Sequence, residues 1–287
     1  MPMVTVIIPC FNQGRYLPDA VNSVLAQTHA DWECIIVNDG STDNTREVAL
    51  ALAAGDERIK YLEQRNKGRS AARNRGLTQA NGRYIQFLDA DDYLLPEKFA
   101  EQIGSAPATG RLLVFYCCCD CVSEDGTVVP GVFSQDPFLD ATDPVVHVAR
   151  DWASPTLCIP VHSWLFDARI FDEHHVRFDG RLHALEDFEC WLRVLELGPL
   201  IIRTRARLAV YRWHEGQTTL DGARMIKGRQ KAVAIAYRYF AHRPEVREAL
   251  RPALLACRAA RGKRLLKPFT SLVPLRIKLA AERLLWR

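Results

Sequence analysis

Short apolar runs alternate with amphipathic segments along the first part of the chain. The runs are rich in β-branched and aromatic residues and predict four strands, at residues 3–9, 32–37, 59–62 and 84–88. Apolar positions at helical spacing and small residues between the strands predict three helices, at residues 17–25, 43–53 and 71–74. Strands that alternate with helices form βαβ units around a parallel sheet, so the expected fold class is α/β.

Polar clusters follow three of these four strands directly. The carboxyl ends of parallel strands meet at one edge of a sheet, and ligands bind there in open α/β folds. The densest cluster holds Asp89, Asp91 and Asp92. Neighbouring carboxylates raise each other's pKa and favour a bound cation, for which a hard divalent metal that carries phosphate is the obvious candidate. A solvated acidic loop that caps the next helix is the alternative.

Size and composition, with 287 residues, 48% apolar and 25% charged, are those of a globular protein. No apolar run approaches the roughly 20 residues that span a bilayer, and no basic segment precedes the apolar N-terminus. The expected location is therefore cytoplasmic, where the nine cysteines stay reduced. The cluster between Cys117 and Cys121 lacks the spacing of zinc ligands, which favours buried thiols over a metal site.

The C-terminal part of the chain is basic. Residues 223–287 contain 17 Lys and Arg against 3 Asp and Glu, whereas residues 1–222 contain 21 against 31. We expect helices there, with a break at Arg251–Pro252, and two apolar stripes in the last segment, Ile277, Ala280 and Leu284 and then Leu275, Leu279 and Trp286. Peripheral contact with the inner face of a membrane, self-association and a solvated basic face all stay open. No recognition motif for nucleic acid accompanies the charge, so no nucleic acid is expected as a partner.

Two large enzyme classes are disfavoured by missing motifs. No G-x-G-x-x-G follows the first strand, which argues against a dinucleotide enzyme, and no G-x-x-x-x-G-K-[ST] is present.

A later pair of carboxylates is more informative. Glu186 and Asp187 precede apolar positions at helical spacing, so both belong to the first turn of a helix, where the helix dipole favours negative charge.

Five segments in order resemble the motifs of the family 2 glycosyltransferases. They are Val4–Asn12, Gln27–Thr28, Asn38–Asp43, Gly68–Asn74 and Phe87–Asp92. The resemblance implies a GT-A fold, that is, a Rossmann-like mixed sheet flanked by helices, here with a C-terminal helical extension. It also implies a nucleotide-sugar-binding half at 1–103 and an acceptor-binding and catalytic half at 104–222. The basic, helical residues 223–287 form an extension after these two halves.

The same resemblance implies the residues that bind the donor. They are Pro9, Phe11, Asn12, Asp39, Gly68, Arg73, Asp89, Ala90, Asp91 and His214. Asp39 would accept a hydrogen bond from the base, although Asn38 departs from the family's usual Asp-Asp pair at this point. Arg73 would lie near the diphosphate, whose geometry suits a guanidinium. A helix-capping role for Asp39 and a solvated Arg73 are the alternatives.

Asp89 and Asp91 would form the family's D-x-D motif. Asp91 would be the direct ligand of Mn²⁺ or Mg²⁺, and Asp89 would be a ligand residue nearer the ribose. His214 ends a segment like the family's Y-R-x-H and would reach the metal or the diphosphate, with a purely structural histidine as the alternative. His162 falls where the family often lines the acceptor side, but an ordinary loop residue is favoured there.

Asp187 matches the family's catalytic base, which takes a proton from the acceptor hydroxyl in line with the departing nucleoside diphosphate. The processive signature Q-x-x-R-W is absent, which favours transfer of a single sugar. The predicted function is inverting, metal-dependent transfer from a nucleotide-diphospho-sugar, preferably a UDP-sugar, to a glycan or lipid-linked acceptor in cell-surface polysaccharide assembly. A sugar-phosphate nucleotidyltransferase and a non-catalytic nucleotide- or glycan-binding protein are the alternatives.

Overall fold

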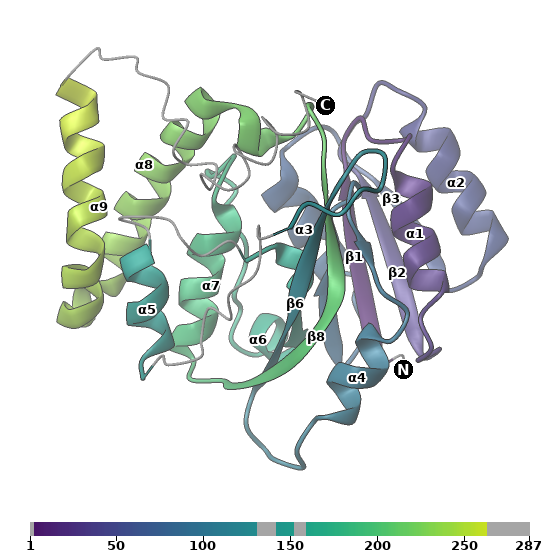
Figure 1. Ribbon diagram of the computed structural model, residues 1–287, viewed down its shortest axis with the longest axis horizontal. Helices are drawn as coiled ribbons and strands as arrows, with labels where there is room; N and C mark the ends of the chain where they lie inside the picture. Colours follow the sequence, from purple (N-terminus) through teal and green to yellow (C-terminus); the bar gives the residue numbers. More distant parts are fainter. Residues whose placement is uncertain (1–2, 131–141, 152–158, 263–287) are drawn as a thin grey trace.

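The computed structural model of the chain describes residues 3–130, 142–151 and 159–262 (Figure 1). Its centre is an eight-stranded sheet with the order β3-β2-β1-β4-β7-β6-β8-β5. The strands are β1 (Val4–Cys10), β2 (Trp32–Asn38), β3 (Ile59–Glu63), β4 (Tyr84–Phe87), β5 (Tyr93–Leu94), β6 (Leu113–Ser123), β7 (Trp164–Asp167) and β8 (Leu200–Trp213). Strands β1 to β4 are parallel, whereas β7 and β5 run antiparallel to their neighbours, so the sheet is mixed.

Helices cover both faces of the sheet (Figure 1). Buried residues of α1 (Leu17–Leu25), α2 (Thr45–Gly55) and α4 (Lys98–Gly104) pack on one face. Those of α3 (Arg69–Leu77), α6 (Arg169–Asp172) and α7 (Glu186–Glu196) pack on the other. The same second core includes α5 (Pro144–Asp151), α8 (Gly222–Tyr239) and α9 (Pro244–Gly262), which lie beside α7 on the side away from the parallel strands.

Alternation along the strands explains the two cores. Ile7 of β1 belongs to one core, and its neighbours Val6 and Ile8 belong to the other. A strand that is covered on both faces must be apolar throughout, which is why these segments read as continuous apolar runs. On the α7 side the rings of Phe166 and Trp191 stack with centroids 4.7 Å apart, which fastens α7 to the sheet.

The strands and helices predicted for the first 90 residues are present, with ends shifted by a few residues. Strand β8 extends far beyond the segment before His214 that the sequence singles out. Its middle part carries the exposed Arg203, Arg205 and Arg207 and therefore lacks an apolar run. The predicted break at Arg251–Pro252 is wrong, since α9 runs through Pro252. The buried face of α9, with Leu250 and Ala253 in the core, offsets the roughly 3 kcal/mol that an interior proline costs. The apolar stripes predicted at 275–286 lie outside the described residues.

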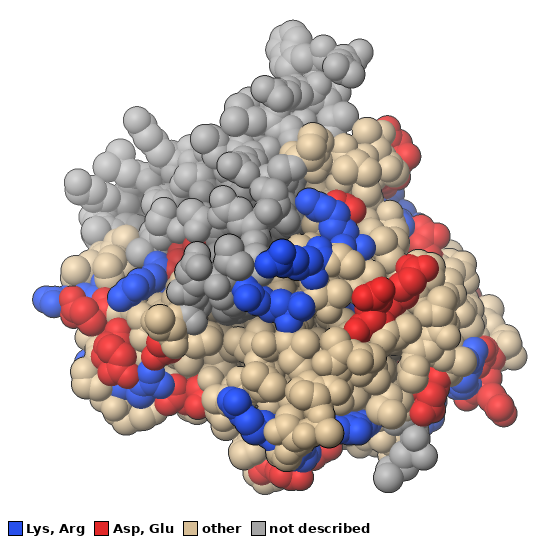
Figure 2. Space-filling model, turned by 60° about the horizontal axis from the view of Figure 1, so that its bottom comes forward, with Lys and Arg blue, Asp and Glu red and all other residues tan. Residues whose placement is uncertain are grey.

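The eight cysteines in the described ranges are free thiols. Cys117, Cys119 and Cys121 point into one core, and Cys118 is half-buried on the other face of β6, as strand alternation requires. Over the part of the chain that is described, no helix is long and apolar enough to cross a membrane. Figure 2 shows a face on which a small group of Lys and Arg lies near the middle, with acidic side chains on either side.

Candidate active site

The loops after β1 and β2 form one continuous surface at the carboxyl edge of the sheet. Cys10 and Asn38 are register partners at the ends of these strands. Asn12 has φ 53°, a left-handed conformation that asparagine tolerates, and its Oδ1 accepts the Thr42 N–H at 2.7 Å. Asp43 also accepts the Gly14 N–H, at 3.1 Å. These side chain–backbone bonds hold the two loops in a fixed relative position.

Asp39 fastens a third loop to this surface. It is 3% exposed, and its carboxylate accepts hydrogen bonds from Gln64 Nε2 at 2.7 Å, Lys67 N at 2.9 Å and Gly68 N at 2.8 Å. Gly68 has φ +89°, which a residue with a side chain rarely adopts, and it directly precedes α3. Asp39 does not cap α2, whose first residue is Thr45. Its carboxylate therefore sets the position of the α3 N-terminus.

The predicted nucleoside-binding residues differ in exposure. Phe11 is 46% exposed, and Asn12 is exposed beside it. Pro9 is buried in β1, and Ala90 is buried after β4. The exposed ring of Phe11 at the edge of the sheet is available for a contact with a ligand.

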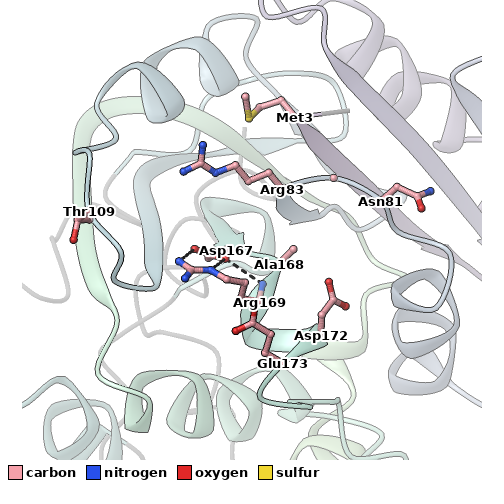
Figure 3. A pocket seen from close by; sticks show the side chains of 10 residues that line it. Met3, Asn81, Arg83, Thr109, Asp167, Ala168, Arg169, Asp172 and Glu173 are labelled. Atoms are coloured by element: carbon pink, nitrogen blue, oxygen red, sulfur yellow. Dashed lines mark hydrogen bonds and ion pairs between the residues drawn. The ribbon is translucent and has the colours of Figure 1, made fainter. Parts of the chain in front are cut away.

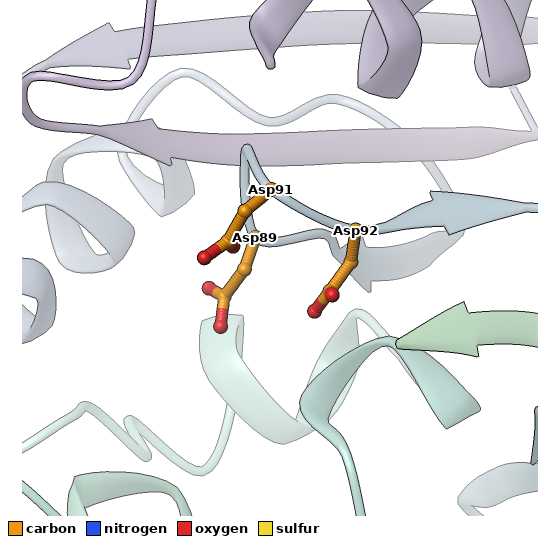
Figure 4. Close-up of side chains that lie close together, drawn as sticks. All are labelled: Asp89, Asp91 and Asp92. Atoms are coloured by element: carbon orange, nitrogen blue, oxygen red, sulfur yellow. The ribbon is translucent and has the colours of Figure 1, made fainter. Parts of the chain in front are cut away.

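The three carboxylates after β4 gather at the same edge (Figure 4). Asp89, Asp91 and Asp92 each offer an oxygen, and these atoms lie within 4.8 Å of one another. In Figure 4 Asp89 and Asp91 lie close together, with Asp92 to one side. Asp92 is buried, 3.0 Å from His162 Nδ1, and accepts the Arg212 N–H at 2.9 Å. Burial raises the pKa of Asp92 to about 6, against the opposing effect of His162.

His214 comes from the end of β8 and meets Asp91. Its Nε2 lies 3.0 Å from Asp91 Oδ2, and its Nδ1 accepts the Gly216 N–H at 3.2 Å. Because Nδ1 accepts a bond, the proton of a neutral ring is on Nε2, which donates to Asp91. The ring also packs against Tyr16 of the loop before α1, with centroids 4.7 Å apart. His214 thus orients the Asp91 carboxylate.

Arg73 connects the acidic cluster to the start of α7. It is buried, and its two terminal nitrogens donate to Asp89 Oδ1 at 2.7 Å and to Glu186 Oε1 at 2.9 Å. Arg69, whose side chain is 42% exposed, lies 3.8 Å from Asp89 and 3.6 Å from Glu186. Burial opposes ionisation of Asp89, but the charges of Arg73 and Arg69 outweigh it and lower the pKa of Asp89 to about 2. Arg73 therefore holds two segments together from within the protein.

Asp187 lies at the start of α7, next to Glu186. The preceding Leu185 has φ 60°, a conformation that costs a non-glycine residue free energy and often occurs at functional sites. Asp187 Oδ1 accepts the Phe188 N–H at 2.8 Å. Burial, together with the charge of Glu186, raises the pKa of Asp187 to about 6. A carboxyl group with such a pKa is suited to accept a proton near neutral pH.

The structure thus brings Asp39, Gly68, Arg73, the acidic cluster, Asp187 and His214 to one edge of the sheet. His162 is fully buried behind Asp92 and has no exposed surface of its own. A separate cavity of about 630 Å³ lies near the opposite end of β1 and β4, lined by Met3, Arg83 and Arg169 among others (Figure 3). Because it lies at the other end of these strands and shares no residue with the site, the cavity has no part in the site described above. Arg169 is paired there with Asp167 at 2.7 Å.

The buried Arg73 predicts a large effect on stability. Arg73→Met would leave Asp89 and Glu186 close together without their shared cation, and breaking a buried pair costs roughly 3–5 kcal/mol. Urea unfolding followed by tryptophan fluorescence measures the loss. The matched control is Arg181→Met, because Arg181 pairs with Asp179 but is 71% exposed, so its change is expected to be much smaller. Equal losses in the two variants would contradict the positioning role of Arg73.

The mixed sheet, covered by helices on both faces, is a GT-A fold. The structure is similar to that of S. aureus TarS 1–349 in complex with UDP-GlcNAc, with a TM-score of 0.68 and 18% identity over 88% of this chain and 72% of that one. It is also similar to the mannosyltransferase PcManGT from Pyrobaculum calidifontis in complex with GDP-Man and Mn²⁺. There the TM-score is 0.61, with 18% identity over 99% of this chain and 87% of that one. The predicted GT-A fold is confirmed.

The family model of glycosyl transferase family 2 matches residues 5–148. GlyG, a glycosyltransferase of Streptococcus pneumoniae serotype 4, is 43% identical over 223 residues, which is 75% of this chain and 72% of GlyG. The chain therefore belongs to glycosyl transferase family 2, and the predicted family and enzyme class are confirmed.

Another relative is TuaG of Bacillus subtilis (strain 168), assigned as a teichuronic acid biosynthesis glycosyltransferase. It is 47% identical over 104 residues, which is 36% of this chain and 41% of TuaG. The chain spans about half of the length of several such relatives, with 54% in the case of the glycosyltransferase EpsJ from the same organism. These relatives place the chain among glycosyltransferases that include one of polysaccharide biosynthesis.

Proposed function

We propose that the protein transfers a single sugar from a UDP-sugar to an acceptor hydroxyl, with inversion at the sugar and dependence on a divalent metal. One observation carries the proposal. Arg73 ties Asp89 of the acidic cluster to Glu186, the neighbour of Asp187, so a cation-binding group and a proton acceptor share one network. A reaction that expels a nucleoside diphosphate and deprotonates a hydroxyl needs these two groups close together.

The donor would lie across the loops after β1, β2 and β4. We propose that Pro9, Phe11 and Asn12 border the nucleoside and that Asp39 contacts the base. The carboxylate of Asp39 already accepts three hydrogen bonds from residues 64–68, so it would meet the base from a fixed position. Gly68 lets the backbone come near the ligand without a side chain.

Arginines and the D-x-D carboxylates would hold the diphosphate and the ribose. Arg73 acts as a positioning residue through Asp89, and the more exposed Arg69 beside it has a guanidinium that suits phosphate oxygens. Asp89 would lie toward the ribose, with Ala90 leaving room between the two acids of the motif.

The acidic cluster fits a hard divalent ion. Its oxygens lie within 4.8 Å of one another, and carboxylates are the ligands that Mn²⁺ and Mg²⁺ prefer. Asp92 is turned toward His162 and the Arg212 N–H, so Asp91 would be the direct ligand and Asp89 a second one. Bound there, the ion would balance the charge that develops on the leaving diphosphate. His214 would keep the Asp91 carboxylate in place through its Nε2–H, as outer partners of metal ligands do.

Asp187 would be the catalytic base. Its raised pKa, about 6, keeps it ionised at neutral pH yet basic enough to take the acceptor proton. The acceptor would then approach from the side of α7, which agrees with a division into a nucleotide-sugar-binding half at 1–103 and an acceptor half at 104–222. We further propose that residues 223–287 form a basic helical extension for peripheral membrane contact or self-association. The relation to TuaG supports an acceptor in cell-surface polysaccharide assembly, either a glycan or a lipid-linked one.

The test identifies the donor and the product. The protein is incubated with Mn²⁺ and a UDP-, GDP- or dTDP-sugar, and the released nucleotide is identified by chromatography. We expect slow hydrolysis of the UDP-sugar, which releases UDP faster than the other two sugars release GDP or dTDP. Release of pyrophosphate would instead indicate a nucleotidyltransferase. Calorimetry that detects no binding of UDP, GDP or dTDP in Mn²⁺ would overturn the proposal.

A further inference from the structure

A basic pocket lies between α8 and the segment that leads into α7. Its volume is about 390 Å³, and its lining includes His183, Asp221, Arg224, Lys227, Gly228 and Lys231. Arg224, Lys227 and Lys231 follow one another at three- and four-residue spacing, so they share one face of α8, and all three are exposed. The Asp221 carboxylate accepts the Arg224 N–H at 2.9 Å as the cap of α8. Among the described residues, no carboxylate forms an ion pair with any of the three cations.

This pocket adjoins the candidate active site through His183. The His183 carbonyl accepts a hydrogen bond from Arg224 Nε at 3.1 Å. Its ring Nδ1 lies 3.6 Å from the position that a Cβ at Gly68 would occupy, and Gly68 donates its N–H to Asp39. Ser70 of α3 also reaches this segment, donating to the Leu182 carbonyl at 3.4 Å. Residues 182–183 therefore separate the basic pocket from the start of α3 and contact both.

A glycine fixes the distance between α8 and the start of α7. A Cβ at Gly228 would lie 2.7 Å from Ala184 Cβ and 2.8 Å from Ala184 O, closer than such atoms can approach. Only glycine allows this contact, which is made two residues before Glu186. The cationic face of α8 is thus held at a set distance from Ala184, three residues before Asp187, by close backbone packing rather than by flexible side chains.

The chemistry of the pocket suits a phosphate group. Two lysines and an arginine offer many N–H donors to an oxyanion, and an arginine fork matches phosphate geometry. The donor diphosphate is assigned elsewhere, to the carboxylates after β4, where we propose that a divalent metal binds. We propose that the pocket binds a phosphate group carried by the acceptor, and so places the acceptor hydroxyl beside Asp187. This inference rests on the proposed function, because it takes Asp187 as the base.

Two sources of that phosphate are compatible with the pocket, namely a phosphodiester within the acceptor chain and the phosphate that joins an acceptor to a lipid. The probes are therefore a soluble hexamer of glycerol phosphate and vesicles of phosphatidylcholine with phosphatidylglycerol. An uncharged hexasaccharide serves as the neutral comparison. Binding of the hexamer alone assigns the chain phosphodiester, and binding of the vesicles alone assigns the lipid phosphate.

The test compares two double variants that remove the same charge. Lys227→Gln/Lys231→Gln changes the pocket, and the control Arg205→Gln/Arg238→Gln changes exposed residues of β8 and of the distant end of α8. We expect the pocket variant to bind the phosphate probe at least about tenfold more weakly, with an effect that shrinks at high salt, and the control to stay within about twofold. UDP binding with Mn²⁺ is expected to be unchanged in both variants.

Three results would overturn the inference. They are unchanged probe binding in the pocket variant, an equal loss in the control, and a loss of UDP binding in the pocket variant, which would assign the pocket to the donor. Failure of the proposed function has a different signature. In that case the unaltered protein binds no nucleoside diphosphate, while its affinity for the phosphate probe still depends on Lys227 and Lys231.

Discussion

Replacing Asp187 by asparagine is expected to lower the rate of sugar transfer by about 10²–10⁴-fold, the contribution that general base catalysis typically makes. Asparagine keeps the shape of the side chain and can still accept the Phe188 N–H, so the start of α7 should not move. It cannot take a proton from the acceptor. Donor binding, measured calorimetrically as UDP affinity with Mn²⁺, should therefore stay as in the unaltered protein, while kcat falls.

The pH dependence gives this prediction a second readout. The base acts only when ionised, and its pKa is raised to about 6, so kcat/KM should be constant above this pH and fall about tenfold per pH unit below it. The residual kcat/KM of Asp187→Asn should not show this fall below pH 6. Asp172→Asn, which changes an exposed carboxylate of α6, is the control. It should retain both the kcat of the unaltered protein and the fall of kcat/KM below pH 6. Near-normal turnover by Asp187→Asn would show that another group is the base.

Much of the fold can be predicted from the sequence because the parallel strands are covered on both faces. Such strands, β1 and β2 above all, are continuous apolar runs bounded by loops, which is a strong local signal. Most of strand β8 was not predicted, because its middle part is exposed and carries alternating arginines. The helix through Pro252 contradicts a local rule, and only tertiary packing explains it.

The candidate site was predicted in part for a similar reason. Residues at strand ends, such as Asp39 and Asp91, can be located from the pattern of strands alone. The role of Glu186 was missed, although its place in the first turn of α7 was predicted, because its partner Arg73 is 113 residues away along the chain. The pairing of Asp92 with His162 was missed as well, since it joins segments 70 residues apart that meet only when β6 and β7 complete the sheet. Burial and long-range pairing are the features that a local pattern does not contain.

Replacing Asp91 by alanine is expected to abolish the metal-dependent part of donor binding. The Kd for UDP in Mn²⁺ should rise at least about 100-fold, a loss of about 2.7 kcal/mol, to the value found in EDTA. Asp91 is the carboxylate that His214 holds toward the cluster. Asp89, the proposed second ligand, is held in place by Arg73, and Asp92 is held by His162. Neither of these two can move into the place of Asp91 without breaking its own buried pair.

The His214→Ala variant separates the roles of ligand and support. Because His214 donates its Nε2–H to Asp91, we expect it to act as an outer partner, whose loss weakens metal affinity about 10–100-fold and less than Asp91→Ala does. Asp120→Asn changes a carboxylate of β6 that pairs with Arg207, and it controls for the loss of one negative charge. It should leave the Kd for UDP in Mn²⁺ unchanged. Equal effects of His214→Ala and Asp91→Ala would make His214 a direct ligand. If the affinity for UDP is the same in Mn²⁺ and in EDTA, UDP binding does not depend on a metal ion at the acidic cluster.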